Sequence, residues 1–322
     1  MIKRLGTALV IIFIAIGGAL PLLPQQAEDA LAKLHREALV WDCHNDLAYR
    51  VLYEGLDIGK RLPGGHVDIP RLQEGNVDVQ VVALFVQNYM YPDKAARQAS
   101  ELLEAMTRAI RENSQWVELA RTGSDVERIA ASGKIAMLLA IEGGHAIEDS
   151  LDTLRDFHRK GVSSMTLTHN ISHGWADSSA DKPRWNGLNQ LGREVVSEMN
   201  RLGTVIDISH VSDKAFFDED TDLRITIEHL SQGRDWPLEG KPTIDDILDH
   251  IDHAVKTAGI DHVGLGADMY PRTPSPEGMR GAHDYGNITR GLKRRGYGDD
   301  EVKKIMGGNF LRVWKRVTEK SG

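Results

Sequence analysis

The sequence predicts an α/β fold of the (β/α)8-barrel (TIM-barrel) type that is incomplete, with about six of the eight strands. Three observations support this prediction. Short β-rich runs alternate with amphipathic helical segments, as in parallel βα units. Most of the predicted strands end in a polar cluster, and barrels of this type build their active sites from the carboxyl ends of the strands. The 322 residues are enough for one barrel of about 250 residues.

The predicted strands are short runs of β-branched and aliphatic residues: Leu39–Asp42, Val77–Val86, Ile135–Ile141, Ser164–Leu167, Val205–Ile208 and His262–Leu265. The predicted helices repeat apolar residues at helical spacing: Lys94–Asn113, Asp149–Lys160, Asn189–Leu202, Ile244–Ala258 and Asp299–Trp314. The stretch between Phe216 and Thr243 should hold two more βα units. It offers only Leu223–Leu230, which is compatible with a strand or a helix. We therefore expect two βα units to be missing there.

The composition excludes several functional classes. The chain has 39 Lys and Arg against 47 Asp and Glu, a net charge of -8, and this argues against a nucleic-acid partner, which requires a basic face. Cys43 is the only cysteine, so the chain forms no intrachain disulfide and no all-cysteine zinc site.

The first residues differ in character from the rest of the chain. Lys3 and Arg4 precede the apolar run Ala8–Ile16, an order typical of an export signal. We expect residues 1–27 to be a signal peptide or an N-terminal anchor, with residues 5–24 as a possible membrane tether. Residues 28–322 then form the barrel domain, exported to the periplasm or the extracellular space.

The chemistry concentrates at the predicted strand ends. His44 and Asp46 follow the first strand, and residues two apart in an extended segment point to the same side. Glu142 follows the apolar run KIAMLLAI, His169 closes SMTLTH, and His210 closes VIDISH. Taken singly, such residues are also compatible with helix capping, a salt bridge or core packing. Together they predict a metal site, because imidazole and carboxylate are the ligands that zinc and similar cations take.

Asp268, in HVGLGAD, stands at the last predicted strand end and is not needed as a ligand. A carboxylate near a cation is suited to accept a proton from water and pass it to a leaving amine. The alternative is an N-cap for the following segment. Cys43 is interpreted as a packed thiol, and His250 and His253 as residues of a solvated helix face.

Longer motifs resemble those of the membrane dipeptidases (renal dipeptidase type), binuclear zinc metallopeptidases with a (β/α)8 barrel. The motifs are WDCHNDL, AIEGGHAIEDSLDTLRDFHRKGVSSMTLTHN, GLNQLGREVVSEMNRLGTVIDISHVSD, DDILDHIDHAVKTAGIDHVGLGAD and GGNFLRVW. The resemblance implies that His44, Asp46 and Glu142 bind the first zinc and that Glu142 bridges to a second zinc held by His210. It also implies that His169 contacts the substrate, that Asp268 is the acid/base, and that the substrates are dipeptides.

The sequence departs from this family after DISHVSDKAFFD. The family continues through two more strands, with a second His ligand of the second zinc and an Arg that binds the substrate carboxylate, and here both are missing. His229 or Arg234 are possible substitutes, and a homodimer is a possible way to cover the open sheet edge. Two zinc ions, as in the family, and one zinc ion are therefore the two alternatives for this chain. The alternatives to a zinc dipeptidase are a non-catalytic relative and a mononuclear amidohydrolase.

Overall fold

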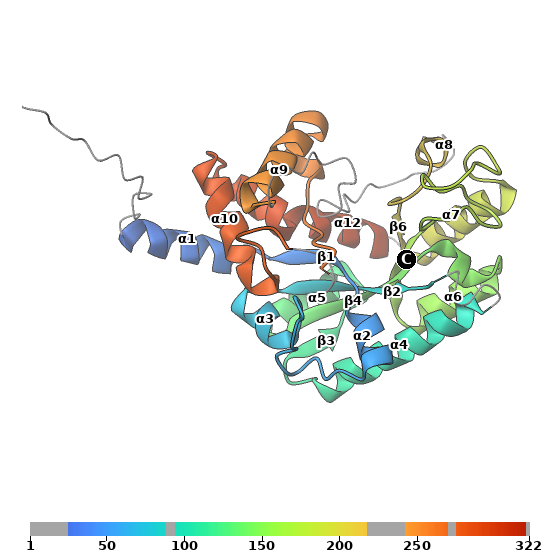
Figure 1. The fold of residues 1–322 in the computed structure, drawn as a ribbon, viewed down its shortest axis with the longest axis horizontal. Coiled ribbons are helices and arrows are strands. Elements are labelled where there is room, and N and C mark those ends of the chain that lie inside the picture. The colour runs from blue at the N-terminus through green and yellow to red at the C-terminus, as the bar shows by residue number, and fades with distance from the viewer. Residues whose placement is uncertain (1–24, 88–93, 218–241, 270–274, 320–322) are drawn as a thin grey trace, which may run out of the picture.

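The computed structural model describes residues 25–87, 94–217, 242–269 and 275–319. Its core is one parallel sheet of six strands, which curls into a half-barrel (Figure 1). The strands are β1 (Trp41–Asn45), β2 (Val79–Phe85), β3 (Val117–Leu119), β4 (Ile135–Glu142), β5 (Val162–Thr166) and β6 (Val205–Asp207). The strand order is β1-β2-β4-β5-β6, and β3 pairs with the first half of β4. This confirms the α/β fold of an incomplete TIM-barrel type.

The strands are buried on both faces, as expected for a parallel sheet covered by helices. In β4, for example, alternate residues pack in two separate clusters: Ala136 and Leu138 face the inside of the half-barrel, whereas Met137 and Leu139 lie under the surrounding helices. This alternation follows from the two-residue period of a strand. It explains why the sequence shows continuous apolar runs such as KIAMLLAI and no polar alternation.

Helices surround the sheet (Figure 1). Along one side lie α2 (Leu47–Glu54), α4 (Ala95–Glu112) and α6 (Leu151–Lys160), and along the other lie α9 (Ile244–Ala258), α10 (Tyr285–Arg294) and α12 (Asn309–Thr318). Four of the predicted helices are confirmed within two residues at either end: α4 (Ala95–Glu112), α6 (Leu151–Lys160), α7 (Gln190–Leu202) and α9 (Ile244–Ala258). Ser150 and Asn189 cap α6 and α7 through their side chains, and Gly161 and Gly203 end these helices in the left-handed conformation.

The predicted helix Asp299–Trp314 is interrupted. It comprises α11 (Asp299–Lys303), the π-type turn η4 (Lys304–Gly308) and α12 (Asn309–Thr318). A side chain at Gly307 would bring its Cβ atom 2.2 Å from the carbonyl oxygen of Leu39. The chain therefore passes against the segment before β1 at this glycine, a tertiary contact that helical periodicity does not reveal.

Several elements were not predicted, and most of them are short. They are α1 (Gln25–Glu37), α2 (Leu47–Glu54), α3 (Ile69–Glu74), α5 (Gly123–Ala131), α8 (Asp213–Phe216), α10 (Tyr285–Arg294), β3 and the 3-10 turns η1 (Gly144–Ile147), η2 (Ile260–His262) and η3 (Ala282–Asp284). β3 has three residues and depends on its pairing with β4, so no local pattern identifies it. α10 is longer, but its sequence YGNITRGLKR contains two glycines, which are poor helix formers.

The predicted strand His262–Leu265 is wrong as a strand. η2 ends at His262, and the residues after it belong to no strand. This segment nevertheless runs beside β1, because Cys43 N donates to Leu265 O at 3.0 Å and Asp268 N donates to His44 O at 3.1 Å. Two hydrogen bonds hold the segment at the position of the last barrel strand without a regular ladder.

Some predictions lie outside the described residues. The signal peptide or anchor falls almost entirely on residues 1–24, and Leu223–Leu230, His229 and Arg234 fall on residues 218–241. Within the part that is described, β6 pairs with β5 alone, so the sheet is open at this edge. None of the described helices has the length and apolar character needed to cross a bilayer.

Candidate metal centre

The carboxyl ends of the strands bring all six predicted site residues to one end of the half-barrel. His44 belongs to β1 and Glu142 is the last residue of β4, whereas His169 and His210 each follow the end of β5 or β6 by three residues. Asp268 lies in the segment beside β1. Asp46 occupies the N-cap position of α2, but its side chain makes no capping hydrogen bond, so the capping interpretation of this residue is not supported.

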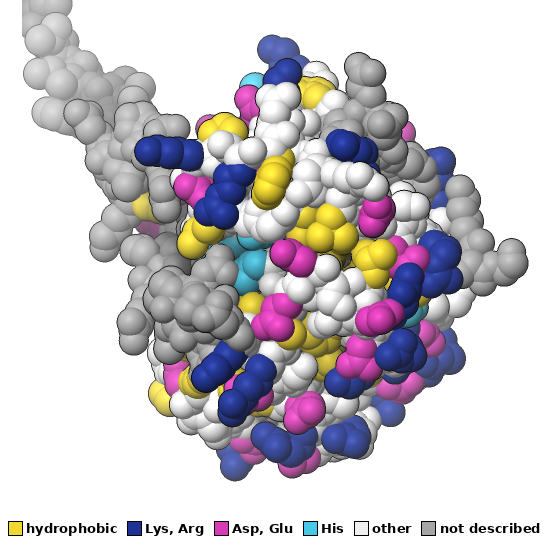
Figure 2. Space-filling view, turned by 90° about the vertical axis from the view of Figure 1, so that its right-hand side faces the viewer, with side chains coloured by type: hydrophobic (Ala, Val, Ile, Leu, Met, Phe, Trp, Pro, Cys, Tyr) yellow, Lys and Arg dark blue, Asp and Glu magenta, His cyan; other side chains and the backbone are white. Residues whose placement is uncertain are grey.

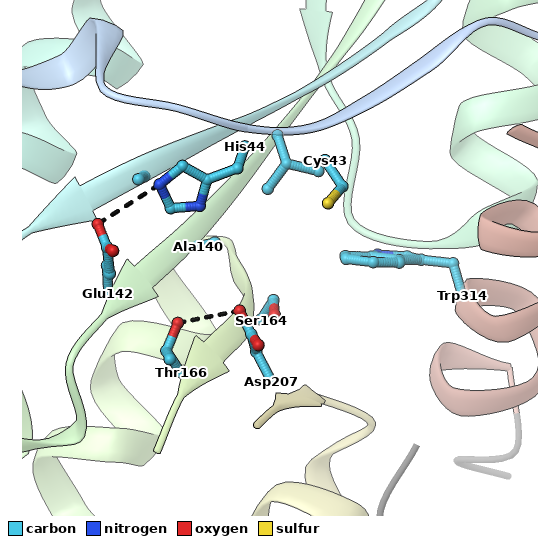
Figure 3. A pocket seen from close by; sticks show the side chains of 10 residues that line it. Cys43, His44, Ala140, Glu142, Ser164, Thr166, Asp207 and Trp314 are labelled. Carbon is cyan, nitrogen blue, oxygen red and sulfur yellow. Dashed lines mark hydrogen bonds and ion pairs between the residues drawn. The ribbon is translucent and has the colours of Figure 1, made fainter. Parts of the chain in front are cut away.

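Glu142 lies at the centre of this group, and its two oxygens face different partners. Oε2 is 3.5 Å from His44 Nε2 (Figure 3). Oε1 is 3.6 Å from His169 Nε2 and 3.8 Å from His210 Nε2. The same His44 Nε2 atom is also 3.7 Å from Asp268 Oδ1. The Glu142 carboxylate therefore joins two clusters of donor atoms.

These clusters are two sets of three residues that could each hold a metal ion. The first set is His44, Asp46 and Asp268, and the second is Glu142, His169 and His210. Within each set the ligand atoms lie within 4.8 Å of one another. Asp268 and His169, for which the sequence suggests catalytic roles, thus lie among the metal-ligand candidates themselves.

The electrostatics of Glu142 are unusual for a buried carboxylate. Burial raises its pKa, but the positive charge of His44, with smaller contributions from His169 and His210, outweighs this effect and lowers the pKa below the ordinary value. The ion pairs described for Glu142 are all with histidines. Among the described residues, only imidazoles balance this buried anion, and an additional positive charge beside it is therefore favourable.

One end of this group reaches the surface. The His169 and His210 side chains are 20 % and 15 % exposed, whereas those of His44, Glu142 and Asp268 are about 5 % exposed or less. Figure 2 shows histidine side chains at the surface, beside hydrophobic and acidic side chains. Among the described residues of the group, His169 and His210 therefore form its more exposed end.

Towards the inside, the group adjoins a small cavity in the half-barrel. Cys43, His44, Glu142, Asp207 and Trp314 are among the residues that line it, and Figure 3 shows Trp314 at the opposite end from Glu142. Cys43 is buried among apolar neighbours, which agrees with its interpretation as a packed thiol. Trp314 packs against Trp41, with ring centroids 5.2 Å apart, and fills this end of the half-barrel.

The sequence profile of the family described as membrane dipeptidase (peptidase family M19) matches residues 28–219 and 226–321. The chain belongs to the membrane dipeptidase family. Dipeptidase tcpJ of Claviceps purpurea (strain 20.1) is 29% identical over an alignment 326 residues long. The alignment covers 86% of this chain and 77% of that protein. The uncharacterized dipeptidase C965.12 of Schizosaccharomyces pombe is 28% identical over an alignment 347 residues long, which covers 90% of this chain and 83% of that protein.

Solved structures of dipeptidases share the fold. The probable dipeptidase PvdM from Pseudomonas aeruginosa has a TM-score of 0.79 at 23% identity, covering 92% of this chain and 100% of that chain. A metallo peptidase from Rhodobacter sphaeroides, liganded with a phosphinate mimic of the dipeptide L-Ala-D-Ala, has a TM-score of 0.76 at 22% identity, covering 87% and 99%. The present dipeptidase is thus a metallopeptidase, and its family implies a metal cofactor and hydrolysis of dipeptides.

Sequence reasoning missed Asp42, a residue of the dipeptidase that anchors the first set. This side chain is completely buried. Its Oδ1 atom accepts hydrogen bonds from the backbone N–H groups of His44 at 3.3 Å and Ala267 at 3.0 Å. It thereby links β1 to the segment that carries Asp268. The sequence did contain a signal for this role, because Asp42 is an acidic residue among the apolar residues at the start of β1.

The connection between β5 and α7 supports the second set. Asp177 accepts hydrogen bonds from three backbone N–H groups of this connection, including Gly187 N at 2.9 Å. Ser179 N donates to His210 O at 2.8 Å. Trp175 packs so closely against Gly144 that a Cβ atom there would lie 2.4 Å from the indole ring. The loop is therefore fastened to the turn after Glu142 and to the backbone of His210.

His210 and Asp268 adopt left-handed backbone conformations, with φ of 64° and 45°. Residues other than glycine adopt this region uncommonly, and such conformations concentrate at functional sites. In both residues the conformation occurs where the chain leaves the edge of the sheet.

Proposed function

We propose that this dipeptidase hydrolyses dipeptides with the help of zinc, and that His44, Asp46, Glu142 and His210 are metal ligands. The observation that carries this proposal is the position of the Glu142 carboxylate, with one oxygen towards His44 and the other towards His169 and His210. A carboxylate that faces two donor clusters is suited to bridge two cations.

The donor atoms fit such ions. Ligands of a tetrahedral zinc ion with bonds of about 2.05 Å lie about 3.3 Å from one another. The distances from Glu142 to the three imidazole nitrogens, 3.5 to 3.8 Å, are close to this value and longer than ordinary hydrogen bonds. Imidazole and carboxylate donors suit zinc and several other divalent ions, so the choice of zinc rests on the family resemblance.

A divalent cation held by these residues would polarise a peptide carbonyl and lower the pKa of water. The residues of the chain supply the remaining chemistry. Asp268 is buried and reaches His44 Nε2 with its Oδ1 atom, so its carboxylate is suited to take the proton from the attacking water and give it to the leaving amine nitrogen. The partly exposed side of His169 and His210 is where a small substrate enters.

The test is metal content and hydrolysis on one sample. The purified full chain is assayed for bound metal per chain and for cleavage of L-Ala-D-Ala, before and after chelation. We expect two metal ions and cleavage that chelation abolishes and added zinc restores. Cleavage that survives complete metal removal would refute the proposal.

The same measurement separates the alternatives that the sequence leaves open. One metal ion per chain with cleavage of other amides, and no cleavage of dipeptides, indicates a mononuclear amidohydrolase. Bound metal without cleavage of any dipeptide indicates a non-catalytic relative. Among the described residues, two sets of three donor residues could each hold a metal ion, and this supports the binuclear dipeptidase.

We also propose that residues 1–27 direct export and that residues 28–322 form the catalytic domain. The basic residues before the apolar run Ala8–Ile16 support this proposal. Cell fractionation of the full chain and of a variant lacking residues 1–27 tests it, because only the full chain should leave the cytoplasm. A homodimer that covers the open edge at β6 remains a prediction, which light scattering checks.

A further inference from the structure

The donor set around Glu142 Oε1 contains a residue to which the family resemblance gives another role. That resemblance makes His169 a contact of the substrate, and the sequence lacks the second His that the family uses to hold its second zinc. In the structure, however, His169 Nε2 is 3.6 Å from Glu142 Oε1, slightly closer than the 3.8 Å of His210 Nε2. The two imidazoles face the same carboxylate oxygen from the segments that follow β5 and β6.

We propose that His169 is a protein ligand of the second metal ion, together with Glu142 Oε1 and His210, and so takes the place of the missing histidine. This inference rests on the proposed function. The three ligand atoms lie within 4.8 Å of one another, which allows all of them to reach one cation at bonds of about 2.0–2.2 Å after small side-chain movements.

The surroundings hold the His169 ring in this orientation. Phe85 pairs with Glu142 in the register between β2 and β4, so its side chain lies beside this carboxylate. Its ring contacts that of His169, with centroids 4.7 Å apart and planes inclined by 57°. On the other side the His210 ring lies 4.5 Å from that of His169. His169 is thus enclosed between an apolar ring and the second imidazole.

The arrangement leaves room for substrate. Three protein ligands and an open position are usual for catalytic zinc, whereas structural sites are closed by four. The second set supplies three protein ligands and is the more exposed of the two, because His169 and His210 keep 20 % and 15 % of their side-chain surface. The open position would lie on this exposed side.

A substitution that introduces a new absorption band gives the sharpest test of whether His169 binds the metal ion. His169→Cys is loaded with Co²⁺ and its near-ultraviolet absorption is recorded, because a thiolate bound to Co²⁺ produces a charge-transfer band that imidazole does not. We expect this band in His169→Cys. We expect none in the wild type, which contains the buried Cys43, and none in His253→Cys, where the replaced histidine is exposed on α9.

Metal counting provides the second measurement. His169→Ala should bind one metal ion fewer per chain than the wild type, and His253→Ala should match the wild type. Circular dichroism confirms that each variant is folded before it is loaded. Full metal content in His169→Ala, with no band in His169→Cys, would overturn the role of His169 and leave the proposed dipeptidase intact. A wild type that binds no metal would overturn the proposed function and this inference together.

Discussion

Asp42 offers the most direct link between the fold and the site. Its Oδ1 atom accepts hydrogen bonds from the backbone N–H groups of His44 and Ala267. His44 belongs to the first donor set, and Ala267 directly precedes Asp268, which also belongs to it. Asp42→Ala removes this acceptor and leaves both N–H groups without it. Asp42→Asn is the matched control, because its amide oxygen can accept the same two hydrogen bonds.

The expected cost follows from these two hydrogen bonds. A buried N–H group that loses its acceptor costs about 1–3 kcal/mol, and Ala267 is only partly buried, so Asp42→Ala should lower the free energy of unfolding by about 2–4 kcal/mol. Asp268 follows Ala267 directly, and a displacement of about 1 Å at a reacting group can cost about 10²-fold in rate. We therefore expect kcat/KM to fall by about 10- to 10²-fold in Asp42→Ala.

Urea unfolding followed by circular dichroism measures the stability of the wild type and both variants, and hydrolysis of L-Ala-D-Ala measures kcat/KM. Asp42→Asn should stay within about 1 kcal/mol of the wild type and keep most of its activity. If the alanine and asparagine variants lose stability and activity equally, the two hydrogen bonds do not position this site and the reasoning is wrong.

Three further predictions concern single residues. Glu142→Ala should lower bound metal at both positions, and full occupancy measured by elemental analysis would exclude a bridging role. Asp268→Asn should reduce kcat by about 10²- to 10⁴-fold with metal content unchanged, whereas unchanged turnover would exclude it as the acid/base. Burial raises the pKa of Asp78 from 3.8 to about 6, against the hydrogen bond from Val40 N, so the folded state binds more protons than the unfolded state between these values. Stability of the wild type relative to Asp78→Asn should therefore fall as pH rises from about 4 to 6, by up to about 3 kcal/mol, and parallel urea midpoints of the two proteins across this range would contradict it.

Local pattern was sufficient for most of the long elements, although it missed α1 and α10. α4, α6, α7 and α9 follow from apolar periodicity, and five strands follow from apolar runs. Pattern failed where an element exists only because of its neighbours. β3 depends on pairing with β4, and the segment after His262 is held beside β1 by two hydrogen bonds without forming a strand.

The sequence by itself predicted which polar side chains meet at one end of the sheet, because polar side chains that directly follow buried strands must emerge at the same edge of a parallel sheet. It also determined the family, through motifs that extend over most of the chain. Only the tertiary structure decided how these side chains divide: His44, Asp46 and Asp268 in one set, and Glu142, His169 and His210 in the other. These residues are far apart along the chain. Their grouping depends on strand order and on the direction in which each chain leaves the sheet, and neither is encoded in local spacing.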